Sequence, residues 1–159
     1  MQRSAKTNAE NADAYERHQQ KCNEIRAENS VLLKEFAAWM RHQDLAEDTV
    51  GMHLRNTAFY VQTYLLYEQP LRPQEGCFGL DMYLGSWFIR KGPIATPGTV
   101  KTNGTSLIKF YSFLVEKGMV TQQQIDAMRK AIKTDMKHWQ ERARRYNDPE
   151  MTDPRKIWI

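Results

Sequence analysis

Residues 98–120 read GTVKTNGTSLIKFYSFLVEKGMV. Apolar side chains recur there at helical spacing, which predicts an amphipathic helix from about residue 97 to residue 117. Gly118 stands where a left-handed residue commonly ends a helix. Gly104 lies in mid-helix, where it costs up to about 1 kcal/mol relative to alanine, so we expect a neighbouring helix to approach closely there. Opposite the apolar stripe lie Lys101, Thr102, Thr105, Lys109 and Ser112.

The remaining segments also predict helices. No proline occurs in residues 1–69 or 98–148, and proline confined to boundaries is typical of an all-α chain. We expect a first firm helix at 30–43 with Ser30 as its N-cap, and others at 47–67, 79–91 and 122–146. Thr121 and Gln124 form a capping-box pattern. Residues 1–29 are a polar extension compatible with a frayed helix, and 147–159 an extended tail that docks on the body or on a second copy.

Composition excludes several classes of protein. The chain has 159 residues, of which 41% are hydrophobic and 26% charged, as in a single globular domain. There is no long uncharged apolar run and no N-terminal apolar segment, so we expect a cytoplasmic protein without membrane contact. The sequence contains no phosphate-binding glycine loop, HExxH or CxxC motif, and its four histidines fall on separate segments. We therefore expect no metal, no cofactor and no enzymatic activity.

Basic residues are concentrated toward the C-terminus. Residues 1–100 hold 11 Lys/Arg against 12 Asp/Glu, whereas residues 101–159 hold 12 against 7. Lys130, Lys133, Lys137 and Arg144 share one stripe of the helix predicted at 122–146. Such a face suits a polyanion, and nucleic acid is the commonest polyanion in cytoplasm. The alternative is a solvated helix face whose charge serves solubility.

Two segments carry a family resemblance. Residues 32–65 read LLKEFAAWMRHQDLAEDTVGMHLRNTAFYVQTYL, with Phe36-x-x-Trp39 followed by a turn from Leu45 to Thr49. Together with residues 98–120, where Leu107 precedes the Phe110–Leu114 aromatic run, this segment resembles the core-binding domain of tyrosine recombinases and phage integrases. The resemblance covers about residues 30–120. It implies an all-α, SAM-like orthogonal bundle of four to five helices, here within a domain at 30–146 that adds a long basic C-terminal helix.

In that family the bundle forms half of a clamp around DNA, through the N-terminal parts of its second and fourth helices. The resemblance therefore implies double-stranded DNA as a partner. Carried over by position, the implied contacts are Thr49, Met52 and His53 on one helix, and Lys101, Thr102, Asn103, Thr105 and Lys109 on the other, to which the charge stripe adds Lys130, Lys133 and Lys137.

The chain also departs from the family pattern. Position 46 is alanine where the pattern favours a Ser or Thr cap. No segment matches the family's catalytic domain, which supplies arginines, a lysine, a His-x-x-Arg box and a tyrosine nucleophile. We therefore expect DNA binding without strand cleavage, as an accessory to a recombinase or a remnant of one. The alternative is a helical interaction or dimerisation module that kept the fold without binding DNA, with a recombinase or a second copy as its partner.

Overall fold

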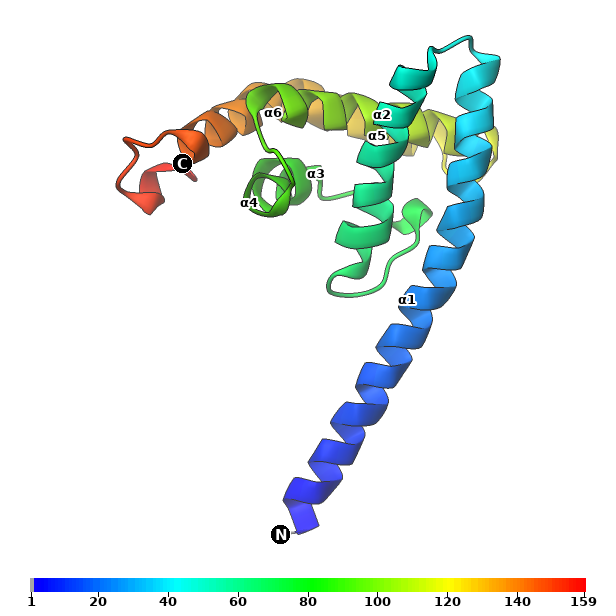
Figure 1. Cartoon of the computed structure of the whole chain (residues 1–159), viewed down its shortest axis with the longest axis vertical. Helices are drawn as coiled ribbons and strands as arrows, with labels where there is room; N and C mark the ends of the chain where they lie inside the picture. The colour runs from blue at the N-terminus through cyan, green and yellow to red at the C-terminus, as the bar shows by residue number, and fades with distance from the viewer. Residues whose placement is uncertain (1) are drawn as a thin grey trace.

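The computed structural model describes the backbone of residues 2–159 and the side chains of residues 5–159. The predicted all-α class is confirmed, since this part of the chain forms helices and no strand. Figure 1 shows two long helices lying side by side, crossing the upper part of a third that projects far from the body. The main helices are α1 (Gln2–His42), α2 (Glu47–Ala58), α3 (Leu80–Met82), α4 (Phe88–Lys91), α5 (Pro97–Glu116) and α6 (Gln122–Asn147).

Helix α1 is continuous across the boundary expected at Ser30, and that prediction is wrong. The Ser30 hydroxyl donates to the carbonyl of Arg26 (2.9 Å), one turn earlier in the same helix, and so does not cap a helix start. No glycine or proline interrupts residues 1–50, so nothing ends the helix locally. Cys22 and Ile25 are buried with Leu66, which ties the middle of α1 to the segment that follows α2. Residues 5–17 lie beyond this contact and are all exposed.

The helix predicted at 47–67 is not α-helical along its whole length. After α2 it continues as a wider π-helical turn, η1 (Phe59–Thr63), and then a tighter 3₁₀ turn, η2 (Tyr64–Leu66). Asn29 of α1 donates to the carbonyl of Val61 (3.1 Å), within the π-helical segment. The helix predicted at 79–91 is likewise interrupted, because α3 and α4 are joined by a second π-helical turn, η4 (Tyr83–Trp87).

Helices α5 and α6 begin and end close to the predicted residues. Thr96 and Thr99 form a capping box at the start of α5, and Thr121 and Gln124 form the predicted one at the start of α6. Gly118 follows α5 with a φ of +72°, in the left-handed region expected for it. The close approach predicted at Gly104 is confirmed, since a Cβ built there would lie 3.0 Å from Met136 of α6.

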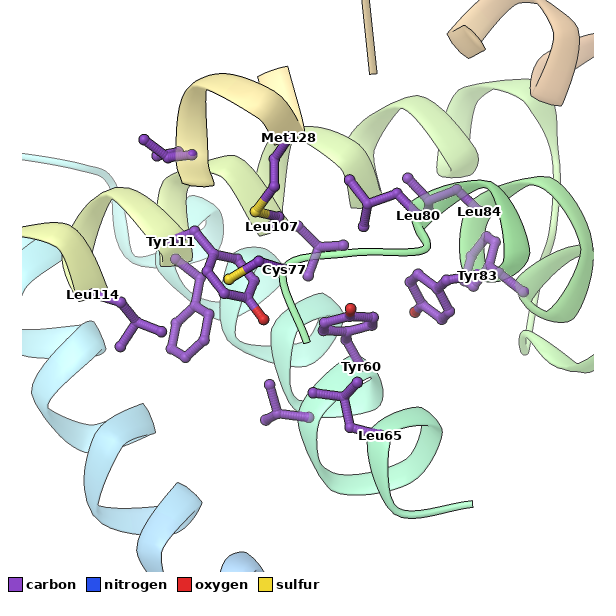
Figure 2. Close-up of a cluster of buried hydrophobic side chains, with 14 of the residues drawn as sticks. Tyr60, Leu65, Cys77, Leu80, Tyr83, Leu84, Leu107, Tyr111, Leu114 and Met128 are labelled. Atoms are coloured by element: carbon purple, nitrogen blue, oxygen red, sulfur yellow. The ribbon is translucent and has the colours of Figure 1, made fainter. Parts of the chain in front are cut away.

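A loop is held inside the core by two tyrosines. The Tyr60 hydroxyl donates to the carbonyl of Gly76 (2.5 Å), and the Tyr111 hydroxyl donates to that of Pro73 (2.5 Å). Figure 2 shows both rings beside Cys77, on elements that lie far apart in the sequence. The segment 70–79 is therefore fixed to α5 and η1 by hydrogen bonds of buried hydroxyls, including its short 3₁₀ turn η3 (Pro73–Glu75).

The C-terminal tail folds back on the end of α6. Arg145 donates to the carbonyls of Ile157 (3.2 Å) and Ile159 (2.7 Å), and the rings of Tyr146 and Trp158 lie 5.9 Å apart. The tail also contains a 3₁₀ turn, η5 (Pro154–Lys156). Over the described residues, no helix has both the length and the apolar character needed to span a bilayer.

Two glycines predict opposite effects of the same substitution. A Cβ at Gly85 would lie 2.6 Å from Cδ1 of the buried Trp139, whereas one at Gly51 would meet only the exposed Arg55 side chain, at 3.4 Å. Gly85→Ala should therefore lower the free energy of unfolding by about 1–3 kcal/mol. Gly51→Ala should raise it by up to about 1 kcal/mol through helix propensity. Chemical denaturation measures both, and a neutral Gly85→Ala would contradict the packing of α6 against η4.

Candidate nucleic-acid interface

Helices α5 and α6 pack antiparallel, and three contacts fix their register. Gln140 donates to the carbonyl of Pro97 (3.0 Å) at one end, and Arg129 donates to the Ser112 hydroxyl (3.3 Å) at the other. Between them Gly104 meets Met136 and Ile132. Interpolation along the two helices sets three pairs of residues at common levels: Lys101 with Lys137, Thr105 with Lys133, and Lys109 with Lys130.

These six residues lie on one surface. Both helices bury their apolar stripes in the same core, which includes Leu107 and Leu114 of α5 and Met128 and Trp139 of α6. Their polar stripes consequently point outward on the same side. Lys101 and Thr105 are exposed and Lys109 is half-buried, while all three α6 lysines are exposed. We call this surface the α5–α6 face: Lys101, Thr105, Lys109, Lys130, Lys133 and Lys137.

The five lysines of the face carry unpaired charge. Within residues 5–159 none of them forms an ion pair. The acids that stand four residues from Lys130 and Lys137 have other partners: Asp126 accepts from Gln122 (2.9 Å), and Glu141 accepts from Arg144 (2.5 Å). Arg144, which the sequence placed on the same stripe, is thus largely neutralised and does not belong to the face.

Two predicted contact residues are buried instead of facing outward. His53 is 4% exposed and lies with Nδ1 2.7 Å from the Ser106 hydroxyl, between α2 and α5. Asn103 is also 4% exposed and donates to the carbonyl of Thr99 (2.8 Å). The His53 side chain joins α2 to α5, whereas the Asn103 amide bonds within α5, so we correct their expected role from DNA contact to a structural one inside the packed helices.

The hydroxyls of α5 are already engaged. Thr102 donates to the carbonyl of Gly98 (2.9 Å) and Thr105 to that of Lys101 (3.2 Å), so either hydroxyl must rotate before it can donate to a phosphate. At the helix start the Thr99 N–H is capped by Thr96, and Pro97 has no N–H. The free backbone donors expected at this end are therefore few, and the lysines remain the main anion-binding groups.

Helix α2 packs against α5, the helix that carries half of the α5–α6 face. Asn56 donates to the Ser106 hydroxyl (3.0 Å), which also bonds His53, so α2 crosses α5 at this level. Thr49 is half-buried one turn before His53, near the start of α2. Sequence reasoning missed Ser106, Asn56 and Arg129 as the residues that join the three helices. Their polar side chains look like surface residues until the partner helix is known.

Burial and a neighbouring charge both act on His53. Desolvation lowers the pKa of its ring below the ordinary 6.5, and the positive charge of Lys109 lowers that pKa further. With the ring neutral and its proton on Nε2, Nδ1 accepts the Ser106 hydroxyl proton, while the Ser106 oxygen accepts from Asn56. A protonated His53 would add positive charge near Lys109, and its Nδ1–H would have to donate to the Ser106 hydroxyl instead of accepting from it.

Burial keeps several thiol and hydroxyl groups of the core protonated. Among the described side chains, no group of three or more His, Cys, Asp and Glu is placed to hold a metal ion. Burial raises the pKa of the Cys77 thiol to about 11 and holds the hydroxyl pKa values of Tyr83 and Tyr111 well above their usual range. These groups stay protonated and inert near neutral pH. The α5–α6 face can attract a polyanion electrostatically.

No protein-family model matches this chain, nor does any curated protein or solved structure. The similarity to recombinase core-binding domains is therefore carried only by the residues quoted for it.

The buried histidine predicts how stability responds to pH. Because folding lowers the His53 pKa, the unfolded chain binds more protons, and stability should fall as the pH drops below about 6.5. This group can contribute at most about 1.4 kcal/mol per pH unit. His53→Gln should flatten the pH dependence measured by denaturation between pH 7.5 and 5.5. Lys109→Met should raise the His53 pKa measured by NMR, and an unchanged pKa would contradict the proximity of the two side chains.

Proposed function

We propose that this protein is a non-catalytic DNA-binding domain that carries duplex DNA across the α5–α6 face. One observation carries the proposal, namely five lysines without ion pairs at matched levels of two antiparallel helices. Lys101 and Lys109 are eight residues apart, or about 12 Å, and Lys130 and Lys137 about 10.5 Å. These lengths are on the scale of the major groove, which is about 12 Å wide.

The pairing of charges argues against a merely solvated helix face. A solvated helix commonly sets lysines against acids three or four residues away, which stabilises the helix. On α6 the acid four residues from Lys137, Glu141, is paired with Arg144, whereas Asp126, four residues from Lys130, accepts from the neutral Gln122 and keeps its charge. The charge of Lys137, and that of Lys101, Lys109 and Lys133, which have no acid three or four residues away, is thus left uncompensated, and a bound phosphate backbone would remove the resulting self-repulsion. Phosphate contacts of this kind position a protein on DNA without reading its sequence.

The resemblance to recombinase core-binding domains supports the same assignment. In that family the fourth helix approaches DNA, and its counterpart here is α5, which supplies half of the face. We propose further that the chain binds without cutting. Of the seven tyrosines, Tyr60, Tyr83 and Tyr111 are buried, and burial raises their hydroxyl pKa values, so these three make poor nucleophiles. A recombinase that cleaves the same DNA is the corresponding candidate partner.

The face predicts which lysines control DNA affinity. Lys101→Gln with Lys109→Gln should weaken binding to a duplex of about two helical turns and lower the slope of log K against log salt by about one unit per lost phosphate contact. Lys101 is exposed and Lys109 half-buried, and surface substitutions rarely change stability by more than about 0.5 kcal/mol, so the fold should survive. Fluorescence anisotropy from about 50 to about 200 mM salt measures both quantities.

A matched control removes the same charge elsewhere. Lys6 and Lys21 are exposed on α1, away from the face, and their double change to glutamine should alter affinity and slope much less. Equal losses from the two double variants would mean diffuse attraction and would refute the face. Wild-type protein that fails to bind at low salt, or binds equally at all salt concentrations, would refute DNA binding itself.

A further inference from the structure

A groove runs between α1 and α2, and Figure 1 shows the two helices lying side by side near the loop that joins them. The floor of the groove is apolar and consists of Leu33 and Ala37 of α1 with Leu54 and Ala58 of α2. Its volume of about 510 Å³ lies within the range of about 300–1,000 Å³ that is typical of ligand sites. The two alanines keep the groove hollow, because their short side chains leave space that larger residues would fill.

The groove and α5 lie on opposite sides of this helix pair. On α1, the Trp39 ring centroid lies 5.9 Å from that of Phe113 of α5, and Ala37 is two positions, or about 200°, away around the helix. On α2, Asn56 donates to a hydroxyl of α5 (3.0 Å), and Leu54 is likewise about 200° away. Helix α5 therefore packs on one side of the pair and leaves the groove uncovered on the other.

The rim of the groove is basic on both sides. It consists of Lys34 and Arg41 on α1 and Arg55 on α2, and among the described residues no acid lines the groove. Arg41 is paired with Glu47 (2.8 Å), whereas within residues 5–159 neither Lys34 nor Arg55 forms an ion pair. Neither of these two has an acid three or four residues away that could compensate its charge. An uncompensated cation therefore stands on each side of the apolar floor.

This combination favours an acidic amphipathic helix over other anionic ligands. Lys34 and Arg41 are seven residues apart, or about 10.5 Å along α1, which equals about two turns of a helix lying in the groove. An amphipathic helix presents an apolar stripe with charged residues on both flanks, and such stripes bind in hydrophobic grooves. A fatty acid carries one carboxylate at one end and can neutralise only one side of the rim. A phosphate backbone has charge but no apolar side chains to cover the floor.

We propose that the α1–α2 groove binds an acidic amphipathic helix of a partner protein. Large apolar side chains of that helix, spaced by three, four and seven residues, fill the hollow above Ala37 and Ala58. Its carboxylates lie beside Lys34 on one side of the groove and beside Arg55 on the other. The proposal uses none of the lysines of the α5–α6 face, so it stands or fails independently of DNA binding.

Three synthetic peptides test the chemistry of the occupant. The first is a helical peptide of about 18 residues with leucines at i, i+3, i+4 and i+7 and glutamates on both flanks of the leucine stripe. In the second peptide lysines replace the glutamates, and in the third glutamines replace the leucines. Fluorescence anisotropy should show that the first binds at least about tenfold more tightly than either of the others. Equal binding of any other peptide, or failure of the first to bind, would overturn the proposal.

Charge reversal tests the rim. Lys34→Glu combined with Arg55→Glu should weaken binding of the glutamate peptide by about tenfold or more, because like charges then meet on both sides of the groove. The same double variant should gain affinity for the lysine peptide. Lys6→Glu combined with Lys21→Glu is the matched control, since both residues are exposed on α1 outside the groove and the net charge changes equally. A loss of the same size in the control would mean diffuse attraction and would refute the groove.

Filling the hollow tests the floor. Ala58→Met places a longer side chain in the groove and should weaken the glutamate peptide by about tenfold with the rim charge unchanged. Ala38→Met, at an exposed position of α1 outside the groove, is the matched control and should bind like the wild type. Thermal denaturation checks that both variants are folded. Unchanged binding by Ala58→Met would contradict the proposal, and laurate that binds where the glutamate peptide does not would identify a fatty-acid site instead. Anisotropy with duplex DNA on the same samples reports separately on the α5–α6 face.

Discussion

The close approach of α5 to its two neighbours sets the arrangement of the rest. Gly104 has no side chain to hold α6 away, and Ser106, which is fully buried, is small enough to let α2 cross while it bonds His53 and Asn56. Larger residues at either position would separate the helices by the width of a side chain. Because α6 lies directly against α5, the lysine rows of the two helices become neighbours and form one charged surface.

Local signals accounted for the boundaries of α5 and α6. The capping boxes at Thr96 and Thr121 and the left-handed Gly118 act within one turn of the chain, so the sequence contains them in full. The start of α1 could not be read in this way. A serine such as Ser30 can cap a helix start, but it can equally donate a hydrogen bond to the preceding turn in mid-helix, as it does here. The contact of Cys22 and Ile25 with Leu66 joins residues that are far apart in the sequence, so no local pattern indicates it. The π-helical turns η1 and η4 also had no visible signal.

Helical periodicity predicted the exposed lysines, because a residue opposite the apolar stripe faces solvent whatever lies behind it. Periodicity failed at the edges of the stripe. Asn103 lies on such an edge, and its burial depends on how closely the neighbouring elements pack. His53 of α2 is also buried, and its ring contacts the hydroxyl of Ser106, 53 residues away in the sequence. The neutralisation of Arg144 depends on which of several basic side chains Glu141 selects, and spacing alone cannot decide that.

The α5–α6 face and the groove between α1 and α2, whose floor is Leu33, Ala37, Leu54 and Ala58, both carry basic side chains, and the fold places them on different helices. Neither α5 nor α6 lines the groove, so a ligand in the groove would leave the lysines of the face accessible. Salt would act on contacts at the two surfaces in the same direction but to different degrees. A contact in the groove would retain its apolar floor when charges are screened, whereas the lysine face has only its charge.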